Sequence, residues 1–373
     1  MPINRERILS RFQRLVSIDA PSYGERAMAD ELTRQLTTLG YDVLEDQAGA
    51  VIGGNAGNLI VKIPGTVDLP PLLFSGHMDT VEPAKGKRAQ IHPDGTITSD
   101  GSTILGADDA SALTVILEAL TVIREDQLPH RPLEIVFAVA EEPYTIGSQQ
   151  LDFSQLSAKE AYVLDMDVEI GTAALQAPSI LYFQAKFIGK SAHVGMTPEL
   201  GIHAIKAAAG AVERIPVGHV DARTTINIGT IQGGLATNIV PDTCIFEGEI
   251  RGFDHEAALG SLHQVEQICR ASAAQQGAQV DFQYEIRTVA YRHSKDSAVA
   301  QRFTRVCQQL GFPVKLSRIF GGSDNNTFAE HGIQGLVLAS AMHQCHSCQE
   351  YTTIQELEQL CTLTLGLMTD DRE

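Results

Sequence analysis

The chain has 373 residues, 43% hydrophobic and 20% charged, a composition typical of a soluble globular protein with roughly two or three domains. Its formal charge of −18 argues against binding to nucleic acid or to an anionic membrane, because both need clusters of basic residues. No segment approaches the roughly 18 apolar residues of a membrane helix, and no signal-peptide pattern follows the charged N-terminus. Six scattered cysteines fit a reducing compartment, so we expect a cytoplasmic protein.

The first half of the chain alternates helical and strand patterns. Residues 3–18 have the apolar spacing of a helix, and Ser22 to Glu25 has capping-box spacing before a second helix that ends near residue 39. Residues 82–104 are rich in Gly, Pro, Asp and Thr and are predicted to form a loop region. Further apolar runs predict strands at 42–44, 59–63, 72–77, 133–140 and 162–164 and a helix at 112–123.

Polar residues stand where these apolar runs stop. His77 and Asp79 end one strand and lie two positions apart, so they share a face of an extended chain. Such a pair is a metal ligand with its orienting carboxylate, half of an acid/base pair, or a histidine that only forms a hydrogen bond. Other strand ends carry Glu141–Glu142 and Asp165. Because ligand sites in open α/β sheets lie at the carboxyl ends of strands, we expect these side chains to converge.

Asp108 and Asp109 follow a glycine and precede a helical stretch. They are candidates for the same site, and capping of the helix N-terminus is the alternative.

The second half of the chain contains an inserted pattern. From about residue 180 to residue 286 the elements follow the order β-α-β-β-α-β, which is the ferredoxin-like split unit. Alternation of helices and strands resumes afterwards. We therefore predict an α/β catalytic domain made of residues 1–177 and 291–373, with a mixed sheet between helices, and an inserted ferredoxin-like α+β domain at 178–290.

The polar residues at the strand ends, together with His343 and His346 near the C-terminus, suit zinc, with manganese or cobalt possible. One zinc ion cannot use so many acids, but two ions about 3.5–4 Å apart that share a carboxylate could. Two cations would also offset the repulsion between neighbouring carboxylates. A glutamate that binds no metal could then take a proton from water.

Several stretches, in this order, resemble a known family. They are Gly76 to Thr80, Gly106 to Asp109, Glu141–Glu142, Tyr162 to Asp165, Ser191 to Gly195, Gly233 to Pro241, Glu249 to Arg251, Gly321 to Asp324, and His346 with Glu350–Tyr351. The chain is similar to the dinuclear zinc peptidases and deacylases that include peptidase T, carboxypeptidase G and the acetylornithine and succinyl-diaminopimelate deacylases. The resemblance is closest to the peptidase T-like branch, and it implies a zinc-aminopeptidase-like catalytic domain with an inserted lid and dimerisation domain.

The resemblance implies a role for each matching residue of the catalytic domain. One metal would be held by His77 and Asp165, the other by Glu142 and His346, and Asp108 would bridge both, with a cis peptide after it. Asp167 is the alternative to Asp165 as a metal ligand, and His343 is the alternative to His346. Asp79 would orient His77, and Glu141 would be the general base for a water activated by the two metals and then the acid that protonates the leaving amine.

The inserted domain would supply substrate contacts. His193 would stabilise the oxyanion, and Asn238 and Arg251 would hold the backbone or carboxylate of the substrate. A strand-end salt bridge is the alternative for Arg251, and an exposed loop position is the alternative for His193.

The resemblance thus implies a homodimeric aminopeptidase that binds two divalent metal ions and hydrolyses short peptides such as tripeptides. A deacylase or carboxypeptidase of the same family, acting on acyl amino acids, is the nearest alternative. A catalytically silent dimeric protein that binds metal or peptide is another. A redox protein that uses the Cys-x-x-Cys spacing of Cys345 and Cys348 is a third.

Overall fold

The computed structural model describes residues 3–372 and divides into two compact units. The first unit contains the described residues up to Leu175, then Arg292–Ile319 and those from Ser323 onward, and the second contains Gln176–Tyr291 and Phe320–Gly322. Each unit has its own hydrophobic core. The functional boundaries at 178 and 290 stay a prediction, and residues 1, 2 and 373 of the predicted catalytic domain lie outside the described residues.

The first unit holds most of the helices and strands. Its helices are α1 (Arg5–Val16), α2 (Arg26–Thr38), α3 (Ala48–Ile52), α4 (Ala107–Asp126), α7 (Ala298–Leu310), α8 (Asp324–Glu330) and α9 (Ile354–Met368). Its strands are β1 (Val43–Glu45), β2 (Leu59–Ile63), β3 (Leu72–His77), β4 (Gln90–Ile91), β5 (Thr96–Thr98), β6 (Leu133–Ala138), β7 (Glu160–Leu164), β8 (Thr172–Ala174), β16 (Lys315–Ser317), β17 (Gln334–Leu338) and β18 (Tyr351–Thr353). Two further short strands, β9 (Gln176–Ala177), which belongs to the second unit, and β15 (Tyr291–Arg292), at which the division falls, pair with each other.

An eight-stranded mixed sheet forms the centre of this unit, in the order β1-β2-β6-β3-β7-β17-β8-β16. The four middle strands β6, β3, β7 and β17 are parallel to their neighbours within this group. Their carboxyl ends therefore meet at one edge of the sheet, where open α/β sheets place ligand sites. The antiparallel pairs β1–β2, β2–β6 and β8–β17 make the sheet mixed, as predicted.

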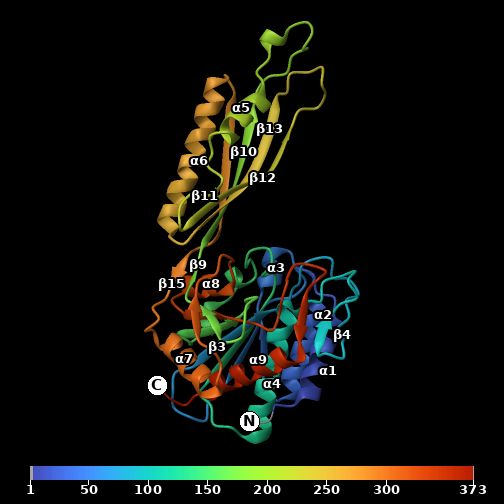
Figure 1. Cartoon of the computed structure of the whole chain (residues 1–373), viewed down its shortest axis with the longest axis vertical. Coiled ribbons are helices and arrows are strands. Elements are labelled where there is room, and N and C mark those ends of the chain that lie inside the picture. Colours follow the sequence, from blue (N-terminus) through green and yellow to red (C-terminus); the bar gives the residue numbers. More distant parts are fainter. Residues whose placement is uncertain (1–2, 373) are drawn as a thin grey trace. The chain divides into compact units, whose positions relative to one another are not determined.

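Alternating side chains of the middle strands pack into two cores. Phe74 and Tyr162 belong to the larger core, together with residues of α1, α2, α4, α7 and α9, and Figure 1 shows α1, α4, α7 and α9 grouped together in this unit. Leu73 and Val163 point to the opposite face and pack with Phe328 of α8. Because successive residues of a strand face opposite ways, both faces must be covered.

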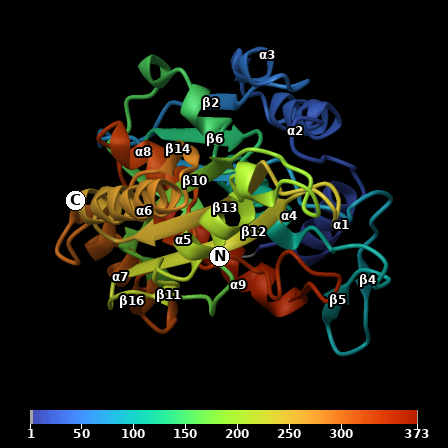
Figure 2. The same cartoon turned by 90° about the horizontal axis from the view of Figure 1, so that it is seen from above.

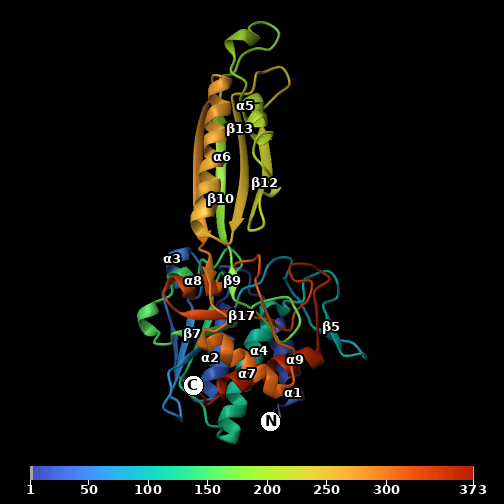
Figure 3. The ribbon, with the colours of Figure 1, turned by 60° about the vertical axis from the view of Figure 1, so that its left-hand side comes forward.

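The second unit is an antiparallel sheet with two helices. Its elements are β10 (Ser179–Ile188), α5 (Ala204–Val212), β11 (Gly218–His219), β12 (Thr224–Gly233), β13 (Thr243–Gly252), α6 (His255–Gln275) and β14 (Gln279–Thr288). The strand order β11-β12-β13-β10-β14 is that of the ferredoxin-like split unit with one short added strand. The helix α6 runs along the strands (Figure 3), and α5 and α6 pack against each other (Figure 2). The predicted fold class is confirmed in both parts.

Two local predictions are wrong. Within 82–104, β4 and β5 form a small sheet with β18. The partner strand comes from the far end of the chain, so no local pattern reveals it. The predicted capping box is also absent: Glu25 is the N-cap of α2 and makes no side-chain cap bond there. Its carboxylate and the Ser22 hydroxyl instead form hydrogen bonds with Ala140 and Asp79 beside the functional site.

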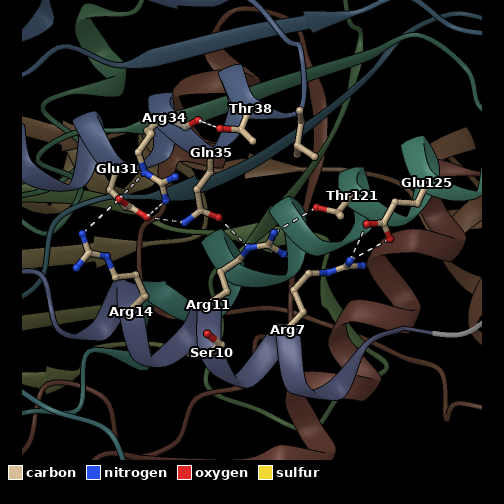
Figure 4. A pocket seen from close by; sticks show the side chains of 11 residues that line it. Arg7, Ser10, Arg11, Arg14, Glu31, Arg34, Gln35, Thr38, Thr121 and Glu125 are labelled. Carbon is tan, nitrogen blue, oxygen red and sulfur yellow. Dashed lines mark hydrogen bonds and ion pairs between the residues drawn. The ribbon is translucent and has the colours of Figure 1, made fainter.

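Arginines of α1 connect three helices of the first unit. Arg11 donates to Gln35 Oε1 of α2 at 2.9 Å and to Thr121 Oγ1 of α4 at 3.2 Å (Figure 4). Glu118 of α4, whose side chain is 0% exposed, lies 2.7 Å from both Arg7 Nε and Arg11 Nη1. A buried carboxylate needs such partners, and the guanidinium groups need it in return.

We predict that Glu118→Ala destabilises the first unit by about 3–5 kcal/mol, because it leaves the partly buried guanidinium group of Arg11 without its carboxylate and removes one of the two carboxylates that contact Arg7. Urea unfolding followed by circular dichroism measures this change. The matched control is Glu358→Ala, which removes the partner of Arg5, a side chain that is 63% exposed. Solvent screens that pair, so little change is expected, and equal effects of the two variants would contradict the prediction.

Candidate metal centre

Side chains from four neighbouring strand ends meet at the carboxyl edge of the mixed sheet. His77 is the last residue of β3, Glu141 and Glu142 follow β6, Asp165 follows β7, and His346 lies between β17 and β18. Asp108 lies at the start of α4 with non-helical angles (φ −81°, ψ 96°), and the peptide bond between Asp108 and Asp109 is cis.

These residues form two groups that could each hold a metal ion. One group is His77, Asp108 and Asp165, and the other is Asp108, Glu142 and His346, with the ligand atoms of each group within 4.8 Å of one another. The two groups share Asp108. Its Oδ1 lies 3.0 Å from His77 Nε2, whereas its Oδ2 lies 3.2 Å from His346 Nε2. The two oxygens of one carboxylate therefore face separate ligand groups.

Asp167 and His343, the alternative candidates for metal ligands, form a separate cluster with Glu356. His343 Nδ1 lies 3.3 Å from Asp167 Oδ1, and His343 Nε2 lies 2.6 Å from Glu356 Oε1. His346 Nε2 instead lies 3.1 Å from Glu142 Oε2. The metal groups accordingly contain Asp165 and His346. Cys345 and Cys348, which flank His346, are both free thiols.

The hydrogen bonds of His77 test whether a cation fits. His77 Nδ1 lies 3.0 Å from the carbonyl oxygen of Asp79, which can only accept, so this nitrogen carries a proton. In a neutral imidazole, Nε2 would then present a lone pair to Asp108 Oδ1. That contact is favourable only with a proton or a metal ion between the two atoms. Glu142 Oε1 is also buried without a hydrogen-bond partner among residues 3–372. The donor set therefore fits divalent cations.

The carboxylates of this edge disturb one another strongly. Burial and the neighbouring Asp165 raise the pKa of Glu141 well above its ordinary value, and burial and Asp108 do the same to the pKa of Asp165. Burial opposes ionisation of Asp108 as well, but hydrogen bonds from His346 and His77 lower the pKa of this carboxyl group. The hydrogen bonds that His346 forms with Asp108 and with Glu142 raise the pKa of His346 to about 10. Ionisation of these clustered acids is therefore unfavourable by itself, and bound cations would favour their charged forms.

Asp79 contacts more than His77. Its Oδ1 lies 3.4 Å from His77 Nδ1 and accepts a hydrogen bond from Glu141 N at 3.0 Å. Its Oδ2 accepts from Glu142 N at 3.2 Å and from the Ser22 hydroxyl at 2.7 Å. The fully buried carboxylate of Asp79 therefore joins the end of β3 to the end of β6.

Other buried acids beside the site have roles that sequence reasoning missed. Glu350 accepts from Gly106 N at 2.6 Å and from Asp108 N at 3.0 Å, which fixes the segment that carries Asp108. Asp109 accepts from His77 N at 3.1 Å, while α4 has no side-chain cap among the described residues, so capping does not explain this acid. Burial raises the pKa of Asp324 to about 6. The only signal in the sequence was that Glu350, Asp109 and Asp324 lie within family-like stretches.

The predicted substrate residues lie in the second unit. His193 and Asn238 are exposed, and their segments are joined by a hydrogen bond from Val194 N to the Asn238 carbonyl at 3.2 Å. Arg251 Nε lies 2.5 Å from Glu249 Oε1, and Arg251 Nη1 donates to the Phe320 carbonyl at 2.8 Å. Arg251 therefore forms a salt bridge, which is the alternative to substrate binding that the sequence left open for this residue.

Among residues 3–372, the helices are too short or too polar to cross a membrane.

Comparisons with known proteins agree with this fold. Residues 177–276 match a family model described as a peptidase dimerisation domain of the M20 type, and residues 58–195 match the peptidase family M28. The chain is 33% identical over 368 residues to the uncharacterized protein YqjE of Bacillus subtilis (strain 168), with 99% of each chain covered.

Two solved structures are also similar over nearly the whole chain. A tripeptidase from Staphylococcus aureus subsp. aureus Mu50 has a TM-score of 0.95 and 35% identity, with 98% of each chain covered. The aminopeptidase PepT from Bacillus cereus ATCC 10987 has a TM-score of 0.92 and 35% identity, again with 98% of each chain covered. Peptidases of the M20 and M28 families depend on metal ions. The chain therefore belongs to the M20 peptidase family as a peptidase T-like member, and it is a hydrolase of the peptidase class.

Proposed function

We propose that this metallopeptidase is an aminopeptidase for short peptides, that it uses two divalent cations, and that Glu141 is its general base. The observation that carries the proposal is the sharing of Asp108, whose two oxygens face two ligand groups. The names of the similar tripeptidase and aminopeptidase support a short peptide as the substrate. A deacylase or carboxypeptidase acting on acyl amino acids would use the same centre and is the alternative that the substrate test addresses.

The cations would be held by the residues of the two groups. His77 and Asp165 would bind one ion and Glu142 and His346 the other, with Asp108 between them. Zinc is the expected metal, and manganese and cobalt also suit imidazole and carboxylate ligands. When bound, the ions supply Lewis acidity that polarises a carbonyl group and lowers the pKa of water.

Glu141 would move the proton. It belongs to neither ligand group, it is only 8% exposed, and it lies in the turn that also carries Glu142. A carboxylate in this place can accept a proton from the attacking water and then give that proton to the leaving amine. Asp79 would hold the backbone of Glu141 while it also orients His77.

The second unit would complete the enzyme. We propose that residues 178–290 act as a lid and dimerisation domain, that His193 stabilises the oxyanion, and that Asn238 and Arg251 hold the substrate. The match to a peptidase dimerisation domain supports a homodimer. The six free cysteines fit the cytoplasm. A monomer in sedimentation velocity would argue against the dimer.

Metal binding should release protons and tighten as the pH rises from 6 to 8.5. The raised pKa of His346, about 10, means that its imidazolium must lose a proton before it can bind a cation. Calorimetric zinc titrations of the metal-free protein, in two buffers of different ionisation enthalpy, measure the protons released.

The His346→Ala variant should bind one zinc ion per chain where the wild type binds two. The matched control is His343→Ala, because His343 contacts Asp167 and Glu356 instead. An equal loss in both variants, or an affinity that does not change with pH, would contradict the assignment.

The zinc- or manganese-loaded protein should release the N-terminal residue of tripeptides faster than it cleaves N-acyl amino acids. Glu141→Gln should keep both metal equivalents and lower kcat by about 10²–10⁴-fold, because it removes the proton acceptor and leaves the ligands in place. Product analysis by mass spectrometry and metal analysis of the same samples provide the measurements.

Glu142→Gln serves as the comparison, since it should lose one metal equivalent together with activity. Preferred turnover of N-acyl amino acids would replace the aminopeptidase proposal with the deacylase. Normal tripeptide turnover by Glu141→Gln would exclude Glu141 as the base.

A further inference from the structure

The turn that carries Glu141 and Glu142 is held by side chains, because it has left the sheet. The strand β6 ends at Ala138, so the amides that follow need other acceptors. Val139 N donates to Asn58 Oδ1 at 3.0 Å, and Ala140 N donates to Glu25 Oε1 at 3.0 Å. The amides of Glu141 and Glu142 donate to the two oxygens of Asp79, Oδ1 at 3.0 Å and Oδ2 at 3.2 Å. Three side chains from distant parts of the chain therefore determine the path of this turn.

Ala140 is the residue of this turn that most needs support. Its φ is +46°, in the left-handed region that residues with a Cβ atom rarely adopt. It lies directly before Glu141, so its backbone angles set the direction in which the Glu141 side chain leaves the turn. The hydrogen bond from Ala140 N to Glu25 is the side-chain contact that holds this conformation.

Glu25 is one of several buried acids of the first unit, and its hydrogen bonds lead to the turn. It is 0% exposed and forms no salt bridge among the described residues. Its Oε1 accepts from both Tyr23 N, at 2.7 Å, and Ala140 N, at 3.0 Å, whereas its Oε2 is buried without a partner among residues 3–372. Burial of a carboxylate in this way is unfavourable for folding. A role in holding this turn would explain why a carboxylate is buried at position 25.

We infer that Glu25 is a positioning residue for the catalytic turn. By accepting a hydrogen bond from Ala140 N, Glu25 holds Ala140 in the left-handed conformation. This conformation directs the Glu141 side chain and brings Glu142 to its proposed ligand position. This inference rests on the proposed function for the roles of Glu141 and Glu142. Among residues 3–372, the hydrogen bonds of Glu25 go to the backbone amides of Tyr23 and Ala140 and not to the candidate ligand side chains, so it acts through the backbone.

Three variants separate positioning from stability. Glu25→Ala removes the acceptor, Glu25→Gln keeps an oxygen that can accept both amide protons, and Glu134→Ala is the matched control. Glu134 is a buried glutamate of β6 that also accepts backbone amides, from Ser157 at 2.9 Å and Ala158 at 3.0 Å, but near the opposite end of the strand. Loss of Glu134 should therefore destabilise the fold without moving the catalytic turn.

We expect Glu25→Ala to lower kcat for trialanine by about 10²-fold with little change in KM, because a small misplacement of a reacting group has effects of that size. Glu25→Gln should return kcat to within a few-fold of the wild type, and Glu134→Ala should keep the wild-type kcat. Urea unfolding of each variant shows how much stability each one loses.

Titration with cobalt chloride, followed by the visible absorption of the bound ion, gives a second readout that needs no turnover. Glu25→Ala should weaken the binding of one of the two cobalt ions by about tenfold, because Glu142 is displaced, whereas Glu134→Ala should not. If Glu25→Ala does not fold, Glu25→Asp, whose shorter side chain withdraws the acceptor, takes its place.

The outcomes distinguish this inference from the proposed function. Wild-type kcat and wild-type cobalt affinity in Glu25→Ala would overturn the inference, as would equal changes in Glu134→Ala. Weakened cobalt binding in Glu25→Ala, with no amide hydrolysis by the wild type, would retain the positioning role and reject the aminopeptidase.

Discussion

Carboxylates that are buried side by side need hydrogen-bond donors or positive charge around them, and the carboxyl edge of the mixed sheet is organised by this need. Backbone amides of the strand ends supply the donors. Asp79 accepts the amides of Glu141 and Glu142, Glu350 accepts that of Asp108, and Asp109 accepts that of His77. Each acid therefore fixes the backbone beside a ligand or the proposed base. The side chains that would touch metal or substrate are thus held by buried acids that touch neither.

A second set of acids is left for cations. Asp165 and Glu142 have pKa values raised by burial, and Glu142 Oε1 lacks a partner among the described residues. Two divalent ions would neutralise this set, with one Asp108 oxygen turned to each ligand group. The division explains how one sheet edge can hold so many acids: some organise the backbone, and others remain available for chemistry. Glu141 is buried among them but outside both ligand groups, which suits a residue that gains and loses a proton.

Much of the fold and several of the candidate ligands could be predicted from sequence, because these candidates stand where an apolar run ends. His77 and Asp165 are clear examples, since their strands are short, continuous and hydrophobic. Glu25 could not be recognised, because its spacing from Ser22 imitates a capping box, while its hydrogen bond to Ala140 joins residues 115 positions apart. The pairing of β5 with β18 was hidden for the same reason. Contacts between distant segments decide these features, and local patterns do not contain them.

The proposed dinuclear centre depends on the sharing of Asp108 by two metal sites. Anomalous diffraction from crystals grown with zinc measures it directly, at wavelengths on both sides of the zinc absorption edge. We expect two peaks, one between His77 and Asp165 and one between Glu142 and His346, with one oxygen of Asp108 facing each peak. A single peak, or a peak between Asp167 and His343 in place of either site, would contradict it.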